Sequence, residues 1–304
     1  MMNFSRGSKN LINLLPNLKF LRDFCLKNEI DIIHTHHRYP ELLANLISKK
    51  SNIKTITTVH SLVEGKRRLS FKSDKIIAVS NSVKNMLQTK YNVPDEKIVM
   101  MYNCIKRFED QPQLPDQDIK VGLGIPSSAK TLLFIGRITK IKGVDILIEA
   151  FKILRKRIKN SYLLILGMNY DNSLDLNIEN LPDGIKLLKQ VENPYKYYSI
   201  ADIVVLPSRI DPFPYVMLEA GFMKKPFIGS NTGGIGEFIN DNINGLLVEP
   251  GNIRQLAEKI EYLLENPEKG KILAHNLFEK VKNHTSCENY FKKLDQIYTE
   301  MLKK

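Results

Sequence analysis

Two carboxylates and two basic side chains stand where strands give way to helices in the second half of this 304-residue chain. Asp211 follows an apolar run in a proline-bounded turn, and Glu219 comes eight residues later. Arg137 and Lys142 follow another apolar run. Carboxylates bind hydroxyl groups, and two cations can neutralise a diphosphate. The pattern predicts a site for a phosphorylated, hydroxyl-rich ligand, although Asp211 also fits an ordinary turn and Glu219 a solvated helix position.

Glycines accompany these groups. Gly136 ends the strand before Arg137, and Gly233 and Gly234 open a further turn. Glycine lets a ligand approach the backbone, and free N–H groups at a helix start attract phosphate oxygens. The loop 136–143 matches neither a Walker loop nor G-x-G-x-x-G, so by itself it also fits a generic basic strand-to-helix loop.

Alternating strands and helices position these residues and predict parallel sheets covered on both faces. We expect two Rossmann-like, doubly wound α/β domains facing a cleft. The predicted domains are 1–106, 107–286 and a closing helix at 287–304, with a polar, proline-rich linker around 109–116. The predicted strands are 31–35, 53–60, 75–80, 97–101, 131–135, 162–166, 185–188, 203–206, 226–229 and 245–248.

Composition excludes several classes of protein. The chain is 43% hydrophobic and 26% charged, as expected for a globular protein, and no apolar run is long enough to span a membrane. The N-terminus lacks the apolar stretch of a signal peptide, so we expect a cytoplasmic protein. The three cysteines, Cys25, Cys104 and Cys287, are widely spaced and fit free buried thiols better than a disulfide framework.

The formal charge of +12 is unevenly distributed. Residues 1–120 hold 20 Lys and Arg against 12 Asp and Glu, and residues 121–304 hold 25 against 21. The basic first half predicts an anionic partner, such as the phospholipid surface at the inner face of the membrane, a nucleotide or a phosphorylated acceptor. A basic surface that serves only solubility remains the alternative. Nucleic acid is not expected, because interleaved aromatic residues are missing.

The motifs resemble the retaining GT-B glycosyltransferases with the E-x7-E motif, also called glycosyltransferase group 1. The resemblance covers most of 75–300. Its motifs are Gly136-Arg137 with Lys142-Gly143, the Asp211 to Glu219 spacing, and Thr232-Gly233-Gly234 with Glu237 and Asn244-Gly245. It implies transfer of a sugar from a UDP- or GDP-linked donor to a glycan or glycolipid acceptor, with retention of anomeric configuration and no obligatory metal or other cofactor. Cell-surface polysaccharide or lipopolysaccharide biosynthesis is the implied process.

The resemblance also implies roles for individual residues. Arg137 and Lys142 would bind the diphosphate and stabilise the departing nucleotide, and Glu219 would bind the ribose hydroxyls. Asp211 stands where the family usually has Glu, beside the donor sugar. Backbone groups of Gly136, Phe213, Tyr215, Val216, Gly233 and Gly234 would complete the donor site.

Histidines and an asparagine mark the first domain. His60 ends a strand that resembles the family's histidine-ended strand, which implies that His60 polarises or orients the reacting sugar. The alternative is a structural histidine that is hydrogen-bonded in the core or at the strand end. His36 and Asn103 are candidate acceptor-side residues. A metal site at His34 and His36 is not expected, because no acidic or cysteine partner is placed beside them.

Some features depart from the family pattern. Asn103-Cys104 stands for the usual Asn-Gly pair, Lys189 stands near the base where glycine is common, and the usual N-terminal strand and glycine-rich turn are not found before His34. We therefore expect the first domain to be incomplete, either because the true start lies upstream, because a separate chain supplies the piece, or because this is a degraded copy. The alternative function is a catalytically silent nucleotide-sugar-binding remnant. At the other end, Tyr290, Leu294, Ile297 and Met301 give the closing helix an apolar face to bury against the first domain.

Overall fold

The computed structural model describes residues 14–105, 116–168, 181–189, 191 and 193–303. The chain forms two compact units. Unit 1 comprises Met1–Tyr102 and Tyr290–Lys304, and unit 2 comprises Asn103–Asn289. The predicted linker around 109–116 lies almost wholly outside the described residues.

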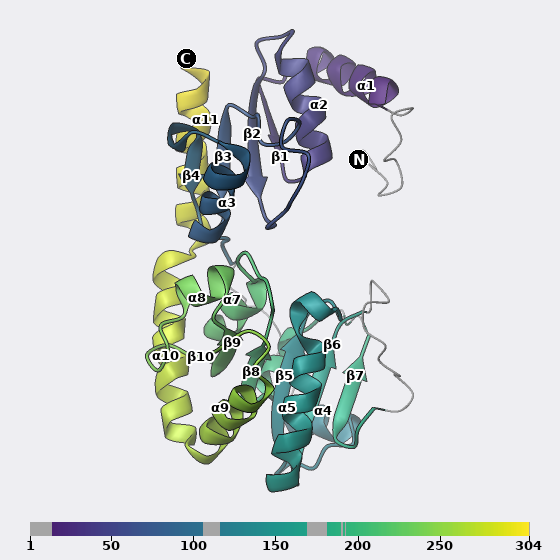
Figure 1. The fold of residues 1–304 in the computed structure, drawn as a ribbon, viewed down its shortest axis with the longest axis vertical. Helices are drawn as coiled ribbons and strands as arrows, with labels where there is room; N and C mark the ends of the chain where they lie inside the picture. The colour runs from purple at the N-terminus through teal and green to yellow at the C-terminus, as the bar shows by residue number, and fades with distance from the viewer. Residues whose placement is uncertain (1–13, 106–115, 169–180, 190, 192, 304) are drawn as a thin grey trace. The chain divides into compact units, whose positions relative to one another are not determined.

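Unit 1 is built on a parallel sheet in the order β1-β2-β3-β4 (Figure 1). Its core joins Ile56 of β2 and Ile77 of β3 to Ile297 and Met301 of α11. Tyr290 and Leu294, also on the predicted apolar face of α11, pack against the same cluster. The elements are α1 (Leu14–Lys27), β1 (Ile32–Thr35), α2 (Arg38–Ser48), β2 (Lys54–Val59), β3 (Lys75–Ala78), α3 (Asn81–Tyr91), η2 (Asp95–Lys97), β4 (Ile98–Met100) and α11 (Cys287–Leu302).

Unit 2 is built on a second parallel sheet, in the order β10-β9-β8-β5-β6-β7. Its strands are β5 (Lys130–Ile135), β6 (Ser161–Leu166), β7 (Ile185–Leu188), β8 (Ile203–Leu206), β9 (Phe227–Ser230) and β10 (Leu246–Val248). Its helices are α4 (Asp116–Gly122), η3 (Lys140–Lys142), α5 (Val144–Arg157), α6 (Tyr195–Ser199), α7 (Tyr215–Phe222), α8 (Gly233–Phe238), α9 (Ile253–Glu265) and α10 (Pro267–His284).

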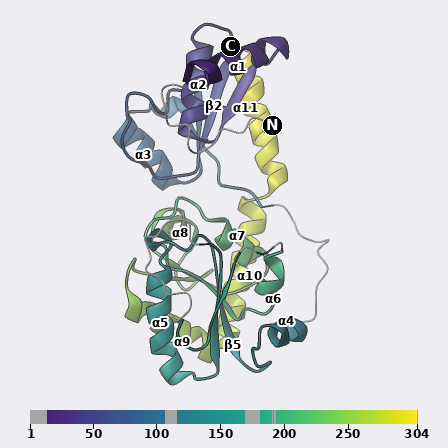
Figure 2. The same ribbon diagram turned by 90° about the vertical axis from the view of Figure 1, so that its right-hand side faces the viewer.

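Helices cover both faces of the unit 2 sheet. Figure 2 shows α5 and α9 on one side of β5, and α4, α6, α7 and α10 on the other. The central strands carry continuous apolar runs because they are covered on both sides. Leu132, Leu133 and Phe134 of β5 and Val204 and Val205 of β8 are accordingly buried.

The predicted α/β class with parallel sheets is confirmed. Both ends of each predicted strand lie within two residues of the corresponding ends of an observed strand. Three of the described helices, α3, η3 and α9, begin at a side-chain cap; in α3 the Ser80 hydroxyl accepts from the N–H of Val83. Among the described residues, none of the helices is both long and apolar enough to cross a lipid bilayer.

The prediction of three free thiols is wrong for two of the cysteines. Cys104 and Cys287 form a disulfide across a sequence separation of 183 residues. The segments that carry them pair side by side, because the N–H of Ile105 donates to the carbonyl of Thr285 at 3.1 Å. Their distance in sequence concealed this pairing. Cys25 is free and buried in unit 1, as predicted.

Candidate functional site

Strand order brings three loops of unit 2 to the same sheet edge. The chain runs from β5 to β6 and β7 on one side, then returns to β8 on the other side of β5. β9 lies next to β8, so the loops after β5, β8 and β9 all leave the carboxyl edge of neighbouring strands. A reversal of strand order of this kind opens the crevice in which α/β sheets bind ligands.

The loop after β5 carries the predicted basic pair. Thr139 caps the short η3 helix, and Gly143 ends it with φ 73°. A side chain at Gly143 would place its Cβ 1.9 Å from the carbonyl oxygen of Pro207, so only glycine lets this loop lie against the loop after β8. Arg137 is exposed and makes no ion pair with any described residue. It is therefore available to an anion.

Lys142 and Asp211 meet directly. The Lys142 Nζ atom lies 2.6 Å from Asp211 Oδ2, and their side chains are only 18% and 3% exposed. The Ser208 hydroxyl donates to the same carboxylate oxygen at 3.2 Å. Burial of a carboxylate costs free energy unless it is paired and hydrogen-bonded, as Asp211 is here. The structure thus joins two of the predicted residues into one charged pair at the sheet edge.

The Gly233-Gly234 turn packs on the backbone of Asp211. Gly233 has φ 50°, and an added Cβ would lie 1.9 Å from the Asp211 carbonyl oxygen. The Gly234 N–H donates to that same oxygen at 3.0 Å. The expectation of a free amide is therefore wrong for Gly234, whose N–H is used to hold two loops together.

Phe213, Tyr215 and Val216 form the entry to α7. Phe213 is buried with its ring edge-on to Phe238, whereas Tyr215 is 49% exposed. α7 begins at Tyr215 after Pro214, without a side-chain cap. The first N–H groups of a helix have no partner within the helix, so the start of α7 presents donors suited to phosphate oxygens.

Glu219 lies one turn into α7, in an aromatic setting. It accepts a hydrogen bond from the hydroxyl of the buried Tyr198 at 2.6 Å. Burial raises the pKa of Glu219 above its usual range, and the Tyr198 bond opposes that rise. Burial, followed by the charge of Glu219, raises the pKa of Tyr195 and of Tyr215.

Arg209 holds the loops together and was not predicted. Its guanidinium pairs with both carboxylate oxygens of Asp145 at 2.8 Å. Its backbone N–H donates to Ile141 at 2.8 Å, and its carbonyl accepts from Thr232 at 3.2 Å. One residue therefore fixes the loops after β5, β8 and β9. Asp145 is the acidic residue in the first turn of α5, and nothing in the sequence spacing marked Arg209 as its partner.

Asn103 belongs to unit 2. Its side-chain amide donates to the carbonyl of Phe213 at 3.0 Å, and the residue is 7% exposed. It therefore supports the turn that carries Asp211 and Phe213. The prediction of an acceptor-side role is not supported by this contact.

Histidines cluster at the carboxyl ends of β1 and β2 in unit 1. His36 Nδ1 lies 3.0 Å from His60 Nε2, and the ring of His34 stacks on that of His36. His34 contacts Tyr298 at 2.6 Å and Thr58 at 2.8 Å. Burial, followed by the charges of His36 and His60, lowers the pKa of His34 to about 4. His34 is therefore neutral and supports the pair formed by the other two rings.

A small cavity of about 170 Å³ adjoins this pair. His36, His60, Thr57, Arg38 and Phe71 are among the residues that line it. Arg38 donates to the carbonyls of Glu64 and Gly65 and to the hydroxyl of Ser70, and these bonds hold the loop that follows β2. Within the described residues, no group of three or more metal-ligating side chains is placed to hold a metal ion.

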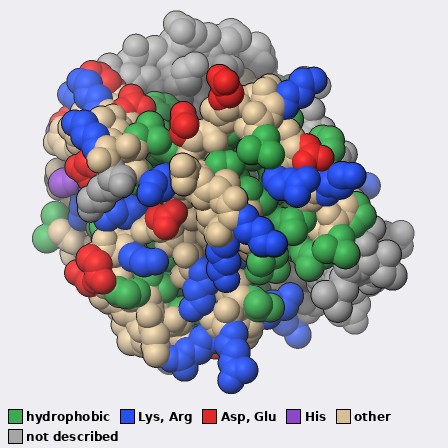
Figure 3. Space-filling view, turned by 90° about the horizontal axis from the view of Figure 1, so that it is seen from above, with side chains coloured by type: hydrophobic (Ala, Val, Ile, Leu, Met, Phe, Trp, Pro, Cys, Tyr) green, Lys and Arg blue, Asp and Glu red, His purple; other side chains and the backbone are tan. Residues whose placement is uncertain are grey.

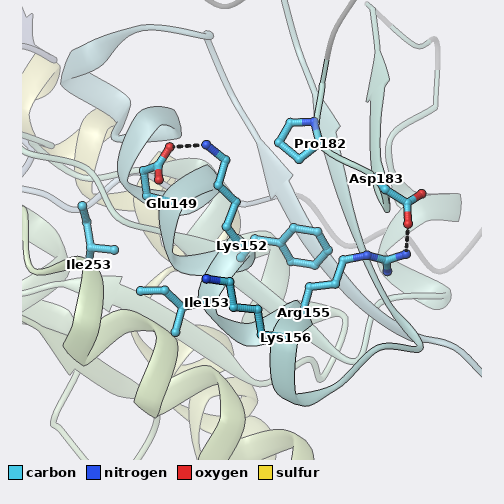
Figure 4. A pocket seen from close by; sticks show the side chains of 9 residues that line it. Glu149, Lys152, Ile153, Arg155, Lys156, Pro182, Asp183 and Ile253 are labelled. Carbon is cyan, nitrogen blue, oxygen red and sulfur yellow. Dashed lines mark hydrogen bonds and ion pairs between the residues drawn. The ribbon is translucent and has the colours of Figure 1, made fainter.

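A larger cavity of about 600 Å³ lies elsewhere on unit 2. It is lined by the last turns of α5, by Pro182 and Asp183 before β7, and by Ile253 of α9 (Figure 4). Two of its basic side chains are already paired, Lys152 with Glu149 and Arg155 with Asp183. It contains none of the predicted site residues. The candidate site is therefore the carboxyl edge, where the predicted residues converge.

Comparison with known proteins gives matches along most of the chain. Residues 115–283 match the family model described as Glycosyl transferases group 1, and residues 3–107 match Glycosyltransferase Family 4. An uncharacterized glycosyltransferase of Methanocaldococcus jannaschii is 30% identical over 310 residues, spanning 97% of this chain and 82% of the relative.

Two further proteins are similar to this chain. The lipopolysaccharide 1,2-N-acetylglucosaminetransferase of Salmonella typhimurium is 26% identical, over 93% of this chain and 75% of that protein. The structure of Anabaena HepE in complex with UDP-glucose has a TM-score of 0.83 and 17% identity, covering 96% of this chain and 84% of HepE.

Proposed function

This chain belongs to the group 1 glycosyl transferases and has the GT-B fold class, and from that premise we propose its reaction. Unit 2 binds a nucleotide-diphosphate sugar, and the enzyme moves that sugar, with retention of configuration, to a glycan or lipid-linked acceptor. Relatives in lipopolysaccharide synthesis support a role in cell-surface polysaccharide. The bound UDP-glucose of HepE supports a UDP-linked donor.

The convergence of charge at the sheet edge carries the proposal. Arg137 and Lys142 bind the diphosphate together with the first N–H groups of α7. As the bond between the sugar and the β-phosphate oxygen breaks, negative charge grows on the departing nucleotide. Fixed cations stabilise that charge more in the transition state than in the bound donor, which accelerates the reaction.

The carboxylates select the rest of the donor. Glu219 binds the ribose hydroxyls through its carboxylate, which Tyr198 orients by its 2.6 Å bond. Asp211 binds a sugar hydroxyl while it holds Lys142, so sugar and phosphate contacts are coupled. In unit 1, the His36–His60 pair binds hydroxyl groups of a reacting sugar, with His60 orienting it. No metal is required in this scheme.

Contact with an anionic membrane surface is a further part of the proposal. Leu15, Phe20, Phe24 and Leu26 of α1 are 48–73% exposed, and Lys19 and Lys27 lie among them. Figure 3 shows basic and hydrophobic side chains interspersed on this end of unit 1. A helix of mixed apolar and basic exposure binds the interface of anionic bilayers. A lipid-linked acceptor would be met there, at the cytoplasmic face.

Nucleotide binding tests the donor site. We expect at least one UDP- or GDP-sugar to bind in calorimetry, and Arg137→Ala to weaken it about 10- to 100-fold, since a charge-assisted contact to phosphate is lost. Arg137 is exposed, so folding should be unaffected. Arg254→Ala, at an 88% exposed side chain on α9, is the matched control. Unchanged binding in Arg137→Ala, or no binding to any donor, would overturn the proposal.

Turnover separates an enzyme from a silent remnant. Release of nucleotide from the bound donor in the presence of a lipid-linked glycan acceptor is expected for the enzyme. Nucleotide binding without release, across a panel of such acceptors, would support the remnant hypothesis instead.

A further inference from the structure

The disulfide between Cys104 and Cys287 lies in unit 2, and the residues beside it make hydrogen bonds to two other parts of that unit. The two Cα atoms are 4.9 Å apart, and both residues are only partly buried. The next residue, Ile105, bridges to Ser286 in parallel and bonds to Thr285. The preceding residue, Asn103, bonds to the carbonyl of Phe213. The cross-link therefore joins the helical end of unit 2 to the turn of the candidate site.

The same disulfide is accessible to a small reagent. A cavity of about 690 Å³ is lined by Cys287 and by Ile105, Phe222, Phe278 and Lys282, among others. Cys287 is also the first residue of α11, a helix of 16 residues. The partial positive charge at a helix N-terminus stabilises a thiolate, so Cys287 is suited to leave as a thiolate.

We propose that Cys104–Cys287 is a thiol–disulfide exchange site for a low-molecular-weight thiol, and that its redox state sets the order of the Phe213 turn through Asn103. A thiolate that enters from the cavity attacks the sulfur of Cys287, forms a mixed disulfide there and expels the thiolate of Cys104. A second thiol then attacks the outer sulfur of the mixed disulfide and releases Cys287 as a thiolate. Two small thiols are oxidised to their disulfide, and the protein disulfide is reduced to two thiols.

The consequence for the candidate site follows from the contacts. With the cross-link intact, residues 103–105 are held at three points: the sulfur bridge, the Ile105 bond and the Asn103 bond. Reduction removes the covalent point and lets the segment move. The Asn103 bond to Phe213 then breaks more often, and the turn that carries Asp211 loses support. Only the effect of reduction on nucleotide affinity rests on the proposed function.

Thiol counting tests the exchange site without any ligand. The full chain is treated with oxidised or reduced glutathione, and reactive thiols are counted after denaturation. We expect one thiol after oxidation, from Cys25, and three after reduction, with a transient glutathione adduct on Cys287 in mass spectrometry. The double variant Cys104→Ser/Cys287→Ser should abolish the response, whereas Cys25→Ala should retain it. Three thiols after oxidation would overturn the proposal.

Hydrogen exchange tests the link to the site. Amides of Asp211, Phe213, Tyr215 and Val216 should exchange about 10-fold faster in the reduced protein, and equally fast in Asn103→Ala whatever its redox state, because about one hydrogen bond is lost. Equal exchange in the oxidised and reduced forms would overturn the link.

Nucleotide affinity then separates this proposal from the proposed function. We expect affinity for a UDP- or GDP-sugar to fall about 10-fold on reduction. If neither form binds a nucleotide sugar while thiol counts and exchange rates still respond, the proposed function fails and the redox site stands.

Discussion

The charge of the Glu219 carboxylate depends on the hydroxyl of Tyr198. Burial raises the folded pKa of Glu219, and the hydrogen bond from Tyr198 lowers it again. As pH falls through that raised pKa, the carboxylate gains a proton and loses an acceptor for ribose hydroxyls. Nucleotide binding should therefore weaken on mild acidification, at a pH above that typical of an exposed glutamate.

Tyr198→Phe should raise the pH at which nucleotide binding begins to weaken. The substitution removes the bond that favours the charged form, so the pKa of Glu219 rises further. Nucleotide dissociation constants measured between pH 4.5 and 8 would show the shift, with Tyr262→Phe on the exposed face of α9 as the control. A parallel loss of affinity at every pH would instead indicate that Tyr198 only supports packing.

His34 gives unit 1 an acid-sensitive point. Its folded pKa of about 4 lies below the unfolded value of 6.5, because burial and the facing His36 and His60 disfavour its charge; Tyr298 faces it as well. Between pH 6.5 and 4 the unfolded chain binds more protons than the folded one, so stability falls as pH falls through this window.

His34→Gln should flatten this dependence while keeping a hydrogen-bonding side chain. Urea unfolding at pH 7 and at pH 5 would show a smaller loss of stability in the variant than in the parent chain. His275→Gln, at a residue of α10 in unit 2, is the control. An equal loss of stability in His34→Gln would show that other groups bind the protons.

At the scale of elements, Arg209 fixes the loops that form the site. The Arg209–Asp145 pair is 39% and 32% exposed, so the pair contributes about 1 kcal/mol or less to folding. Its larger effect should be on loop position. We expect Arg209→Met to weaken nucleotide binding about 10-fold with little change in melting temperature. Arg254→Met is the control, and a double-mutant cycle with Asp145→Asn should show that the two effects are not additive.

The elements could be predicted because periodicity is local. The apolar runs at 131–135 and 203–206 mark buried parallel strands, and the order of strands places their carboxyl ends together. The pairings that finish the site are not local. Arg209 meets Asp145 across 64 residues, Tyr198 meets Glu219 across 21, and Cys104 meets Cys287 across 183. No spacing rule encodes such contacts, since they depend on how loops pack after the sheet forms.

Asn103 is a second case in which a side-chain contact could not be predicted from the sequence. The family resemblance implied an acceptor-side role for this residue, which follows the last strand of the first predicted domain. The structure places it in unit 2, where its amide supports Phe213. A residue at a boundary between units can belong to either, and only its side-chain partner decides which.

At the scale of the whole molecule, unit 1 is assembled from both ends of the chain. Its core needs Ile297 and Met301 of α11 beside Ile56, Ile77 and Met101. Ile297→Ala should therefore cost about 3 kcal/mol of stability in unit 1, through lost burial and a cavity. Unit 2 has its own sheet and core, so its unfolding should be unchanged, and calorimetry should show one transition lowered and one retained.

Removal of residues 290–304 carries the same argument further. The truncated chain keeps every described strand of unit 2 but loses the helix segment that completes the core of unit 1. We expect the transition of unit 1 to disappear while nucleotide binding by unit 2 persists within about 3-fold of the full chain. Ile272→Ala, at a 57% exposed residue of α10, should leave both transitions in place. A single transition that shifts as a whole in either variant would show that the two units unfold together and that the closing helix stabilises both.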